Sequence, residues 1–291
     1  MFAMFWCWFL MIACTENGLV TDDSSNVGDS VPGWSAIAVG YDFGCVLGES
    51  NQARCWGNIA AGSLDMVPSD EFISLTAGFF HVCGLRSDGN IVCWGSDSYG
   101  QSSFAPGLVS NVAAGGHSTC AINDRYELRC SDEFSAVVPA DNAGYTEVAV
   151  GLTFVCASGS TGDTQCWSNA GTDFTIAGSY HGTSMLGLFA CGLTEQGAIY
   201  CWTEGELDSS LTPPSYQSAV QVSAGNGHAC ALFEDGTSTC WGSNEFGESN
   251  VPQVTLSAIA AGSDFSCGLA ADTGEIICWG DNSLSVVSDH N

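Results

Sequence analysis

Positive charge is nearly missing from this chain. Its 291 residues contain no lysine and only four arginines, against 32 Asp and Glu residues, so the formal net charge is −28. A surface of this charge repels phosphate, which argues against nucleic acid as a partner, and it repels anionic lipid headgroups as well. We therefore expect no nucleic-acid partner, and contact with a membrane only through an attached N-terminal lipid.

The motifs of the common catalytic and metal sites are also missing. The sequence has no nucleophile elbow, no phosphate-binding loop, no His-Glu-x-x-His and no close Cys-x-x-Cys pair. The densest carboxylate run is Glu204, Glu206 and Asp208, which has the residue type needed for glycoside hydrolysis but also fits a solvated acidic loop. We expect no catalytic residue, no metal site and no cofactor.

Cysteine, by contrast, is abundant and regularly spaced. Fourteen of the sixteen cysteines form seven pairs, six of them separated by ten residues and the last by eleven. The first cysteines recur every 35 to 39 residues, which indicates a repeat of about 37 residues. The pairs are Cys45 with Cys55, Cys83 with Cys93, Cys120 with Cys130, Cys156 with Cys166, Cys191 with Cys201, Cys230 with Cys240, and Cys267 with Cys278.

Each cysteine pair fits a β-hairpin. In the stretch 81–95, apolar and small residues flank a turn at 87–89, where Gly89 can take the left-handed conformation that ends a three-residue loop. Cys83 then faces Cys93 on a non-hydrogen-bonded pair, where antiparallel strands lie closest. That separation is within the range that a disulfide bridges.

The matched pairs favour disulfides over metal binding and indicate an oxidising compartment. A zinc protein would show close Cys-x-x-Cys spacing, which this sequence lacks. Each disulfide closes a short loop and would stabilise its repeat by about 2–3 kcal/mol. A cross-link in every repeat is physically reasonable, because so short a unit buries little apolar surface alone.

Two further markers keep the same period. Tryptophan follows the second cysteine in six repeats, and glycine lies five residues before the first cysteine in six. The third repeat has Ser131 in place of tryptophan, and the fifth has Leu186 in place of glycine. The tryptophans are Trp56, Trp94, Trp167, Trp202, Trp241 and Trp279, and the glycines are Gly40, Gly78, Gly115, Gly151, Gly225 and Gly262.

Together these residues resemble a known repeat. The pattern Ala-Gly-x-x-His-x-Cys-x-Leu, then Asp-Gly, then Cys-Trp-Gly-x-Asn, clearest in 224–244 and 77–97, resembles the short bacterial form of the regulator of chromosome condensation repeat. The resemblance covers about residues 34–287 and implies an all-β fold, a seven-bladed β-propeller with one disulfide in each blade. Blades three and five match least well, and His117 of blade three is displaced by one place, so we expect these blades to be the least regular. The nucleotide-exchange activity of the family's namesake is not carried over, because no matching motif is found.

Two short segments precede the repeats. Residues 1–13 are almost wholly apolar and predict a signal peptide. Residues 11–14, Met-Ile-Ala-Cys, resemble a bacterial lipobox, which implies a lipid on Cys14; the alternative is an ordinary signal peptide in which Cys14 is incidental. Residues 14–32 are polar and acidic and predict a flexible tether rather than a calcium site.

The propeller is predicted over residues 33–291. A short fourth strand is expected at Ser102 to Pro106, and Ser283 to Val287 is a candidate to pair with the first blade. The blades are placed near 33–68, 69–106, 107–139, 140–176, 177–214, 215–252 and 253–291.

His81 and His228 lie two residues before the first cysteine of their blades, where four other blades carry phenylalanine. A position shared by His and Phe indicates packing, with the imidazole hydrogen-bonded to a neighbouring loop, rather than catalysis or metal binding. The six tryptophans are likewise expected to pack between blades.

The sequence thus predicts a monomeric, non-enzymatic scaffold, either a lipoprotein of a bacterial cell envelope or extracellular, that binds an unidentified protein or glycan through its loops. One alternative is a secreted inhibitor of an enzyme, by analogy with a propeller-type β-lactamase inhibitor of the same superfamily. Another is a hydrolase or lyase, which would need a His and two or more carboxylates to meet in the central channel or at its mouth. Candidate ligand-contact residues, at loop positions that depart from the repeat, are Tyr99, Tyr126, Tyr180, Phe246, Glu204 and Glu206.

Overall fold

The computed structural model describes residues 33–58, 67–139, 142–159, 162–208, 211, 213 and 218–282. The predicted signal peptide and tether, with Cys14, lie outside these residues, and so does the segment Ser283 to Val287. Within the described residues, no helix is long and apolar enough to cross a membrane.

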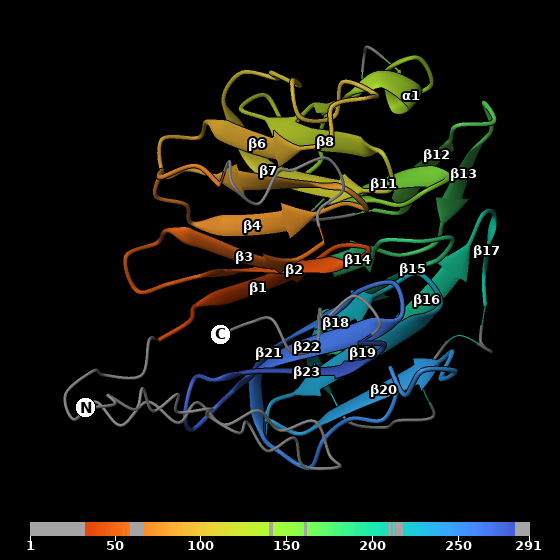
Figure 1. Cartoon of the computed structure of the whole chain (residues 1–291). Helices are drawn as coiled ribbons and strands as arrows, with labels where there is room; N and C mark the ends of the chain where they lie inside the picture. The colour runs from red at the N-terminus through yellow and green to blue at the C-terminus, as the bar shows by residue number, and fades with distance from the viewer. Residues whose placement is uncertain are drawn as a thin grey trace, which may run out of the picture.

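Seven antiparallel sheets follow one another along the chain (Figure 1). Within each sheet, strands that are consecutive in the sequence lie next to each other. Five sheets have three strands and two have four. In blade order the strands are β1 (Ala36–Val39), β2 (Phe43–Leu47) and β3 (Ala53–Gly57); β4 (Ser74–Ala77), β5 (His81–Leu85) and β6 (Ile91–Gly95); β7 (Val109–Gly115), β8 (Ser118–Asn123) and β9 (Leu128–Cys130); β10 (Glu147–Val150), β11 (Phe154–Ser158), β12 (Thr164–Ser168) and β13 (Asp173–Ile176); β14 (His181–Met185), β15 (Ala190–Leu193), β16 (Ile199–Thr203) and β17 (Glu206–Leu207); β18 (Ala219–Ala224), β19 (His228–Phe233) and β20 (Ser238–Gly242); β21 (Leu256–Ala261), β22 (Phe265–Ala270) and β23 (Ile276–Gly280).

The sheets are arranged in a closed ring. The first strand of each sheet lies beside the first strand of the next, in the order β1, β4, β7, β10, β14, β18 and β21, and β21 returns to β1. Figure 1 shows the first and last sheets next to each other. The predicted seven-bladed β-propeller is confirmed, and contact between the first strands of blades one and seven closes it.

The fourth strands were predicted in the wrong place. Residues 102–106 form no strand, because Ser102 and Ser103 instead donate their backbone N–H groups to the Asp97 carboxylate in a compact loop. The fourth strands are β13 and β17, in blades four and five. In blade three the short helix α1 (Asp132–Ser135) follows β9, and in blade five β14 shifts register between His181 and Ser184. The first strands of blades three, six and seven shift register as well, so register does not single out blades three and five as the least regular.

All seven predicted disulfides are present, each between the second and third strands of its own blade. In chain order they join Cys45 to Cys55, Cys83 to Cys93, Cys120 to Cys130, Cys156 to Cys166, Cys191 to Cys201, Cys230 to Cys240, and Cys267 to Cys278. The pairing predicted from the cysteine spacing is therefore confirmed at every position.

The register of the strands accounts for this pairing. Cys83 faces Cys93 in the β5–β6 register, and their Cα atoms lie 4.1 Å apart. The inserted residue of the last pair is taken up in the turn, since Cys267 still faces Cys278. The hairpin interpretation of the repeat is confirmed.

Burial of the paired cysteines differs between their two strands. The cysteine of each second strand is fully buried, whereas Cys55 and Cys240 on third strands are only partly buried. Cys166 and Cys201, also on third strands, are fully buried, in the two blades in which a fourth strand covers the third. The disulfides thus lie inside the sheets, and their outer sulfur atoms are covered best where a fourth strand is present.

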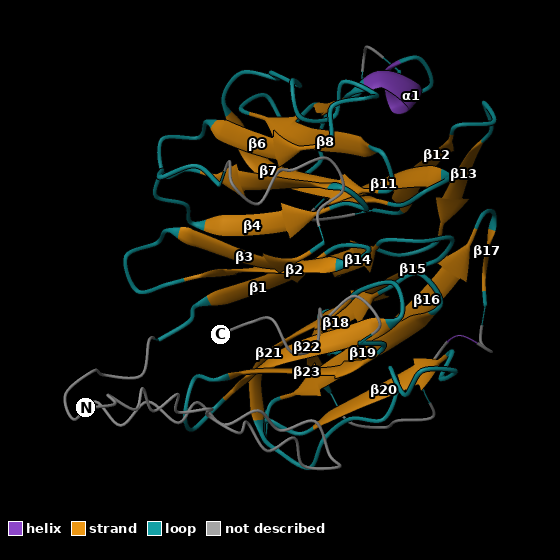
Figure 2. Ribbon diagram, viewed as in Figure 1, coloured by secondary structure: helices purple, strands orange, loops and turns teal. Residues whose placement is uncertain are grey.

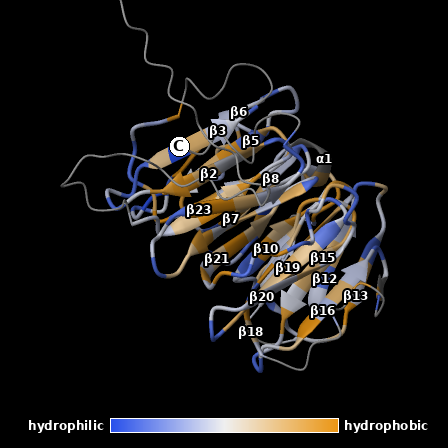
Figure 3. Cartoon of the chain, turned by 60° about the horizontal axis from the view of Figure 1, so that its bottom comes forward, coloured by the Kyte–Doolittle hydropathy of each residue, from blue (hydrophilic) through white to orange (hydrophobic). Residues whose placement is uncertain are grey.

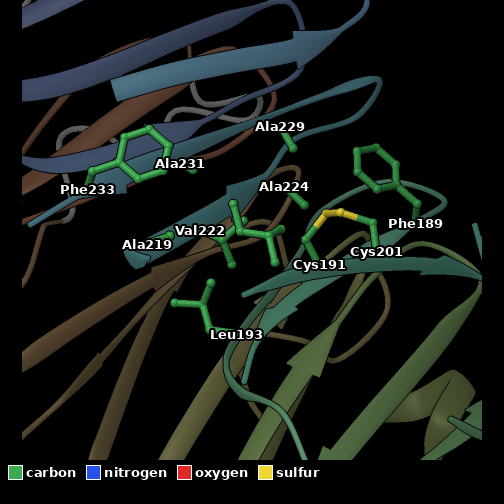
Figure 4. Close-up of a cluster of buried hydrophobic side chains, with 11 residues drawn as sticks. Phe189, Cys191, Leu193, Cys201, Ala219, Val222, Ala224, Ala229, Ala231 and Phe233 are labelled. Atoms are coloured by element: carbon green, nitrogen blue, oxygen red, sulfur yellow. A yellow bond between two sulfur atoms is a disulfide. The ribbon is translucent and has the colours of Figure 1, made fainter. Parts of the chain in front are cut away.

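The hydrophobic core lies between blades. The described residues form seven clusters of buried apolar side chains, and each cluster draws its members from two neighbouring blades. Figure 4 shows the cluster between blades five and six, in which Leu193 and Cys191 approach Val222. Figure 3 shows the same distribution over the molecule, with apolar strands inside and polar turns at the ends. One such cluster joins blade one to blade seven and includes Val39 and Phe265.

Each tryptophan of the repeat packs onto the preceding blade. Trp94 of blade two lies in the cluster with blade one, Trp167 in the cluster with blade three, and Trp56 in the cluster with blade seven. The prediction that the tryptophans pack between blades is confirmed. Blade three has Ser131 instead, and its cluster with blade two has only three buried apolar members, Leu85, Val109 and Ala121.

The repeated glycine is needed where neighbouring backbones approach each other. A Cβ atom on Gly40 would fall against the Gly78 carbonyl, and one on Gly115 would fall onto the Val150 carbonyl. At the seam between the last and first blades, a Cβ on Gly262 would lie 2.9 Å from the Gly40 carbonyl oxygen. A side chain at these positions would push the blades apart.

The two histidines join neighbouring blades through hydroxyl groups. His81 Nε2 lies 2.8 Å from Thr119 Oγ1, and this hydroxyl donates to the Gln101 carbonyl at 2.9 Å, so the imidazole is the donor. His228 repeats the arrangement with Ser266, at 2.8 Å, and Glu248. The packing role is confirmed, although the partner is a strand of the next blade rather than a loop. Burial lowers the pKa of His81 to about 3 and that of His228 to about 4.

The turns between second and third strands need a left-handed residue. Gly89 has a φ of 83° there, and its carbonyl accepts a hydrogen bond from Val109 of the next blade. In blade three the same position is held by Tyr126, with a φ of 62°, and its carbonyl accepts from Tyr145. A bulky residue in this conformation is strained.

Glycine at position 126 should therefore relieve the strain in this turn. We expect the free energy of unfolding of Tyr126→Gly to be about 1 kcal/mol higher than that of Tyr126→Ala. Both variants lose the ring, but only glycine removes the strain of the left-handed backbone conformation. Reversible denaturant unfolding of the two variants measures the difference. Equal midpoints and slopes would show that the turn is not strained.

The buried histidines should make the fold sensitive to acid. Both stay neutral in the folded protein, whereas the unfolded chain binds protons below a pH of about 6.5, so stability falls as the pH is lowered from 6.5 towards 4. The slope is up to about 1.4 kcal/mol per pH unit for each histidine. The double variant His81→Phe/His228→Phe should lose this part of the slope, measured by unfolding at several pH values. A control, His181→Gln, alters an exposed histidine and should keep the slope; a double variant that kept it too would contradict us.

Candidate functional site

The loops of the ring gather at two mouths. The first mouth contains the turns between the first and second strands and the segments that follow the third strands. Hydrogen bonds join the two kinds of segment: Ser96 N donates to Phe80 O, and Asn58 N donates to Asp42 O. The second mouth holds the turns between the second and third strands. Figure 2 shows these loops at the ends of the strands.

The predicted contact residues are divided between the two mouths. Tyr99, Phe246 and Glu204 belong to the first mouth, and the two aromatic side chains there are 47% and 52% exposed. Tyr126 belongs to the second mouth and is 55% exposed. Glu206 begins β17, and its side chain lies outside the described part of the structure.

Tyr180 must be removed from the contact residues. Its side chain is 5% exposed, and its ring lies 5.2 Å from that of Trp202. Burial of the ring, rather than ligand binding, therefore explains why this loop departs from the repeat. The hydroxyl remains satisfied because it donates to the Ala177 carbonyl at 3.1 Å.

One group of aromatic rings spans three blades at the first mouth. We call Tyr41, Phe79, Phe80, Tyr99 and His117 the aromatic patch. Tyr41 of blade one lies 5.3 Å from Phe79 and 5.7 Å from Phe80, between ring centroids. His117 of blade three stacks on Phe80 at 5.7 Å and lies 4.8 Å from Tyr99. Phe79 is buried, Tyr41, Phe80 and His117 are partly exposed, and Tyr99 is the most exposed of the five.

Backbone hydrogen bonds fix the patch on the ring. Tyr41 N donates to the Phe79 carbonyl at 3.2 Å, and Phe79 N donates to the Gly116 carbonyl at 2.9 Å. The segment that carries Tyr99 is held by the buried Gln101, whose side-chain oxygen accepts from Tyr99 N at 2.8 Å. The rings are thus presented by a preorganised surface, which lowers the entropic cost of binding.

Sequence reasoning identified Tyr99 but missed most of the patch. Phe79 and Phe80 occupy a turn in which blade six has Asn226 and Gly227, and this substitution of two aromatic residues for small polar ones was the available signal. Phe246, in contrast, forms no ring contact with the patch within the described structure.

Carboxylates lie beside the aromatic patch, at the seam between blades seven and one. We call Asp42, Asp264 and Asp281 the acidic group. Burial raises the pKa of Asp42, and the charges of Asp264 and Asp281 raise it further. Burial also raises the pKa of Asp264, as do the neighbouring acids, although Ser263 opposes this by donating to its carboxylate. Among the described residues, no group of three or more His, Cys, Asp or Glu side chains has the geometry to hold a metal.

The central channel lacks the residues of an acid–base site. The first strands of all seven blades enclose a cavity of about 190 Å³. The described residues that line it are apolar or uncharged, with Thr76, Ser184, Ser223 and Gln221 as examples of the polar ones, and none is Asp, Glu or His. Glu204 lies at the first mouth, where it accepts from Thr172 Oγ1 at 3.1 Å. Within the channel, the described residues therefore do not bring together the His and carboxylates that a hydrolase or lyase would need.

Comparison with known proteins identifies the repeat. The family model described as "Regulator of chromosome condensation (RCC1) repeat" matches residues 72–101, 219–248 and 257–285. These segments contain blade two, blade six and most of blade seven.

Solved structures share the fold over most of the chain. The ectodomain of the Arabidopsis thaliana receptor kinase ACR4 is 23% identical with a TM-score of 0.71, covering 87% of this chain and 98% of that one. The ectodomain of the Physcomitrella patens receptor kinase CR4 is 23% identical with a TM-score of 0.69, covering 85% and 73%. Prp20p from Saccharomyces cerevisiae is 13% identical with a TM-score of 0.65, covering 81% and 82%.

The repeat markers, the disulfide-bonded blades and the similarity to these structures all indicate the same fold. The chain is a seven-bladed β-propeller with one disulfide in each blade, and its second, sixth and seventh blades carry the regulator of chromosome condensation repeat.

Proposed function

We propose that the protein is an exported, non-enzymatic scaffold that binds a protein partner through the first mouth of its propeller. The observation that carries the proposal is the aromatic patch. Aromatic rings at a surface bury a large area at little cost in side-chain entropy, which makes them effective anchors for a partner. Three blades each supply rings to this one patch.

The rest of the ring supports a binding role over a catalytic one. The blades are cross-linked individually and packed against each other, so the turns that carry the rings are held in fixed positions. The uncharged channel offers no group for proton transfer among its described lining residues. A secreted inhibitor would use the same mouth, and it would differ only in that its partner is an enzyme whose activity falls on binding.

The disulfides support export. Disulfides form and persist in oxidising compartments, and two structures that share the fold are receptor ectodomains. We place the protein at a bacterial cell envelope, held by a lipid on Cys14, which lies outside the described residues. A freely secreted ring is the alternative.

The binding proposal predicts which surface captures the partner. The purified ring, immobilised and exposed to an envelope extract of its native host, should retain a protein identifiable by mass spectrometry. The variant Phe80→Ala/Tyr99→Ala should retain at least tenfold less of that protein, because it removes two anchors of the patch. The control Tyr126→Ala removes an exposed ring from the second mouth and should retain the same amount.

Correct folding of each variant is checked by its thermal midpoint and by the absence of free thiols. Undiminished capture by the double variant, or loss of capture with Tyr126→Ala, would refute binding at the first mouth.

The anchoring proposal predicts a modified N-terminus. The intact mass of the protein from the membrane fraction of its native host should show lipid on Cys14, since several acyl chains anchor a protein firmly whereas a single chain does so only marginally. The variant Cys14→Ser should be recovered in the soluble fraction. If both forms are soluble with the same cleaved N-terminus, the protein is freely secreted.

A further inference from the structure

The aromatic patch and the acidic group share one turn of blade one. Tyr41 and Asp42 are consecutive residues of the same turn, and the Asp42 carbonyl accepts from Asn58 N at 2.7 Å. Across the seam, Asp264 lies in the equivalent turn of blade seven, where Gly262 approaches the Gly40 carbonyl. The first mouth therefore presents carboxylates on blades seven and one, followed by aromatic rings on blades one, two and three.

The cations of the chain are elsewhere. All four arginines lie in, or within two residues of, the turns of the second mouth. Arg86 pairs with Asp70 at 3.0 Å, Arg129 pairs with Glu127 at 2.8 Å, and Arg54 lies 5.6 Å from the Trp34 ring. Arg125 is in the turn of blade three. The negative charge at the first mouth is consequently opposed by no arginine of the protein itself.

Such a surface is complementary to a ligand with two properties. A guanidinium or ammonium group placed among the carboxylates relieves their mutual repulsion, and over an aromatic face it gains a cation–π interaction. An aromatic or long aliphatic group beside it buries apolar area on the patch. The raised pKa values of Asp42 and Asp264 agree with this: burial is the larger cause, and a bound cation would offset the smaller part that comes from neighbouring carboxylates.

Resting on the proposed function, we infer that the partner inserts a basic segment, in which Arg or Lys side chains alternate with aromatic or aliphatic ones, across Asp42, Asp264, Tyr41 and Phe80. A neutral glycan is the competing ligand for an aromatic surface with carboxylates. Its hydroxyl groups hydrogen-bond to carboxylates but do not offset the charge, so the basic segment fits better.

The test uses short labelled peptides and the oxidised ring. The probe is a twelve-residue peptide of Arg-Trp-Ser repeats, and its match has Glu in place of Arg; a neutral oligosaccharide series provides the third arm. We expect the ring to bind the Arg peptide at least a hundredfold more tightly than the Glu peptide, and to bind the neutral sugars no better than the Glu peptide. Fluorescence anisotropy at 150 mM salt measures the affinities.

Two double variants distinguish binding at the first mouth from general attraction of a cationic peptide to a negatively charged protein. Asp42→Asn/Asp264→Asn removes two charges at the first mouth, and Glu195→Gln/Glu234→Gln removes two exposed charges at the second. We expect the first pair to weaken Arg-peptide binding at least tenfold and the second less than twofold. Equal effects of the two pairs, or tighter binding of a neutral sugar, would overturn the inference.

The outcome is separable from that of the proposed function. If Phe80→Ala/Tyr99→Ala abolishes capture of the native partner while Asp42→Asn/Asp264→Asn leaves it unchanged, the first mouth binds a partner that is not basic, and only the present inference fails. If neither double variant alters capture, both fail.

Discussion

The contact between neighbouring blades is the interaction on which this structure depends. Every buried apolar cluster is shared by two blades, and a three-stranded sheet of this size cannot bury enough surface alone. In six blades a tryptophan completes the core shared with the blade before it, and in six a glycine five residues before the first cysteine lets the two backbones meet. The histidine–hydroxyl pairs supply the polar part of the same contact in two interfaces.

This arrangement explains why function resides in the turns. The repeated residues lie in the strands and at the contacts between blades. The turns at the two mouths carry few of them, so these turns can differ from blade to blade. The first mouth gains its aromatic character from consecutive phenylalanines in one turn and its acidic character from aspartates in two others. The ring brings together turns that are far apart in the chain, and none of these residues would form a surface without it.

The sequence was informative wherever one repeat could be compared with another. The cysteine spacing, the tryptophans and the left-handed glycine of the turn predicted the blade count, the disulfides and the core, because each marker reports contacts within one blade or with the next. The fourth strands were misplaced because β13 has only four residues with a weak pattern, while the loop at 97–103 is closed by the Asp97 side chain. Tyr180 was misjudged because departure from a consensus does not distinguish a ligand contact from local packing. The aromatic patch escaped notice because it depends on distances among three blades, which no single repeat encodes.

The seam between the first and last blades differs from the other six in one respect. It joins segments roughly 220 residues apart, such as those of Val39 and Phe265, whereas successive blades bring together segments about 38 residues apart. Loop-closure entropy grows with the logarithm of loop length, so this seam costs about 1.5 kcal/mol more to form than its neighbours. The seven disulfides do not reduce that cost, because each lies within a blade. Within the described chain the units are therefore cross-linked covalently, while the circle that they make is closed by non-covalent contacts alone.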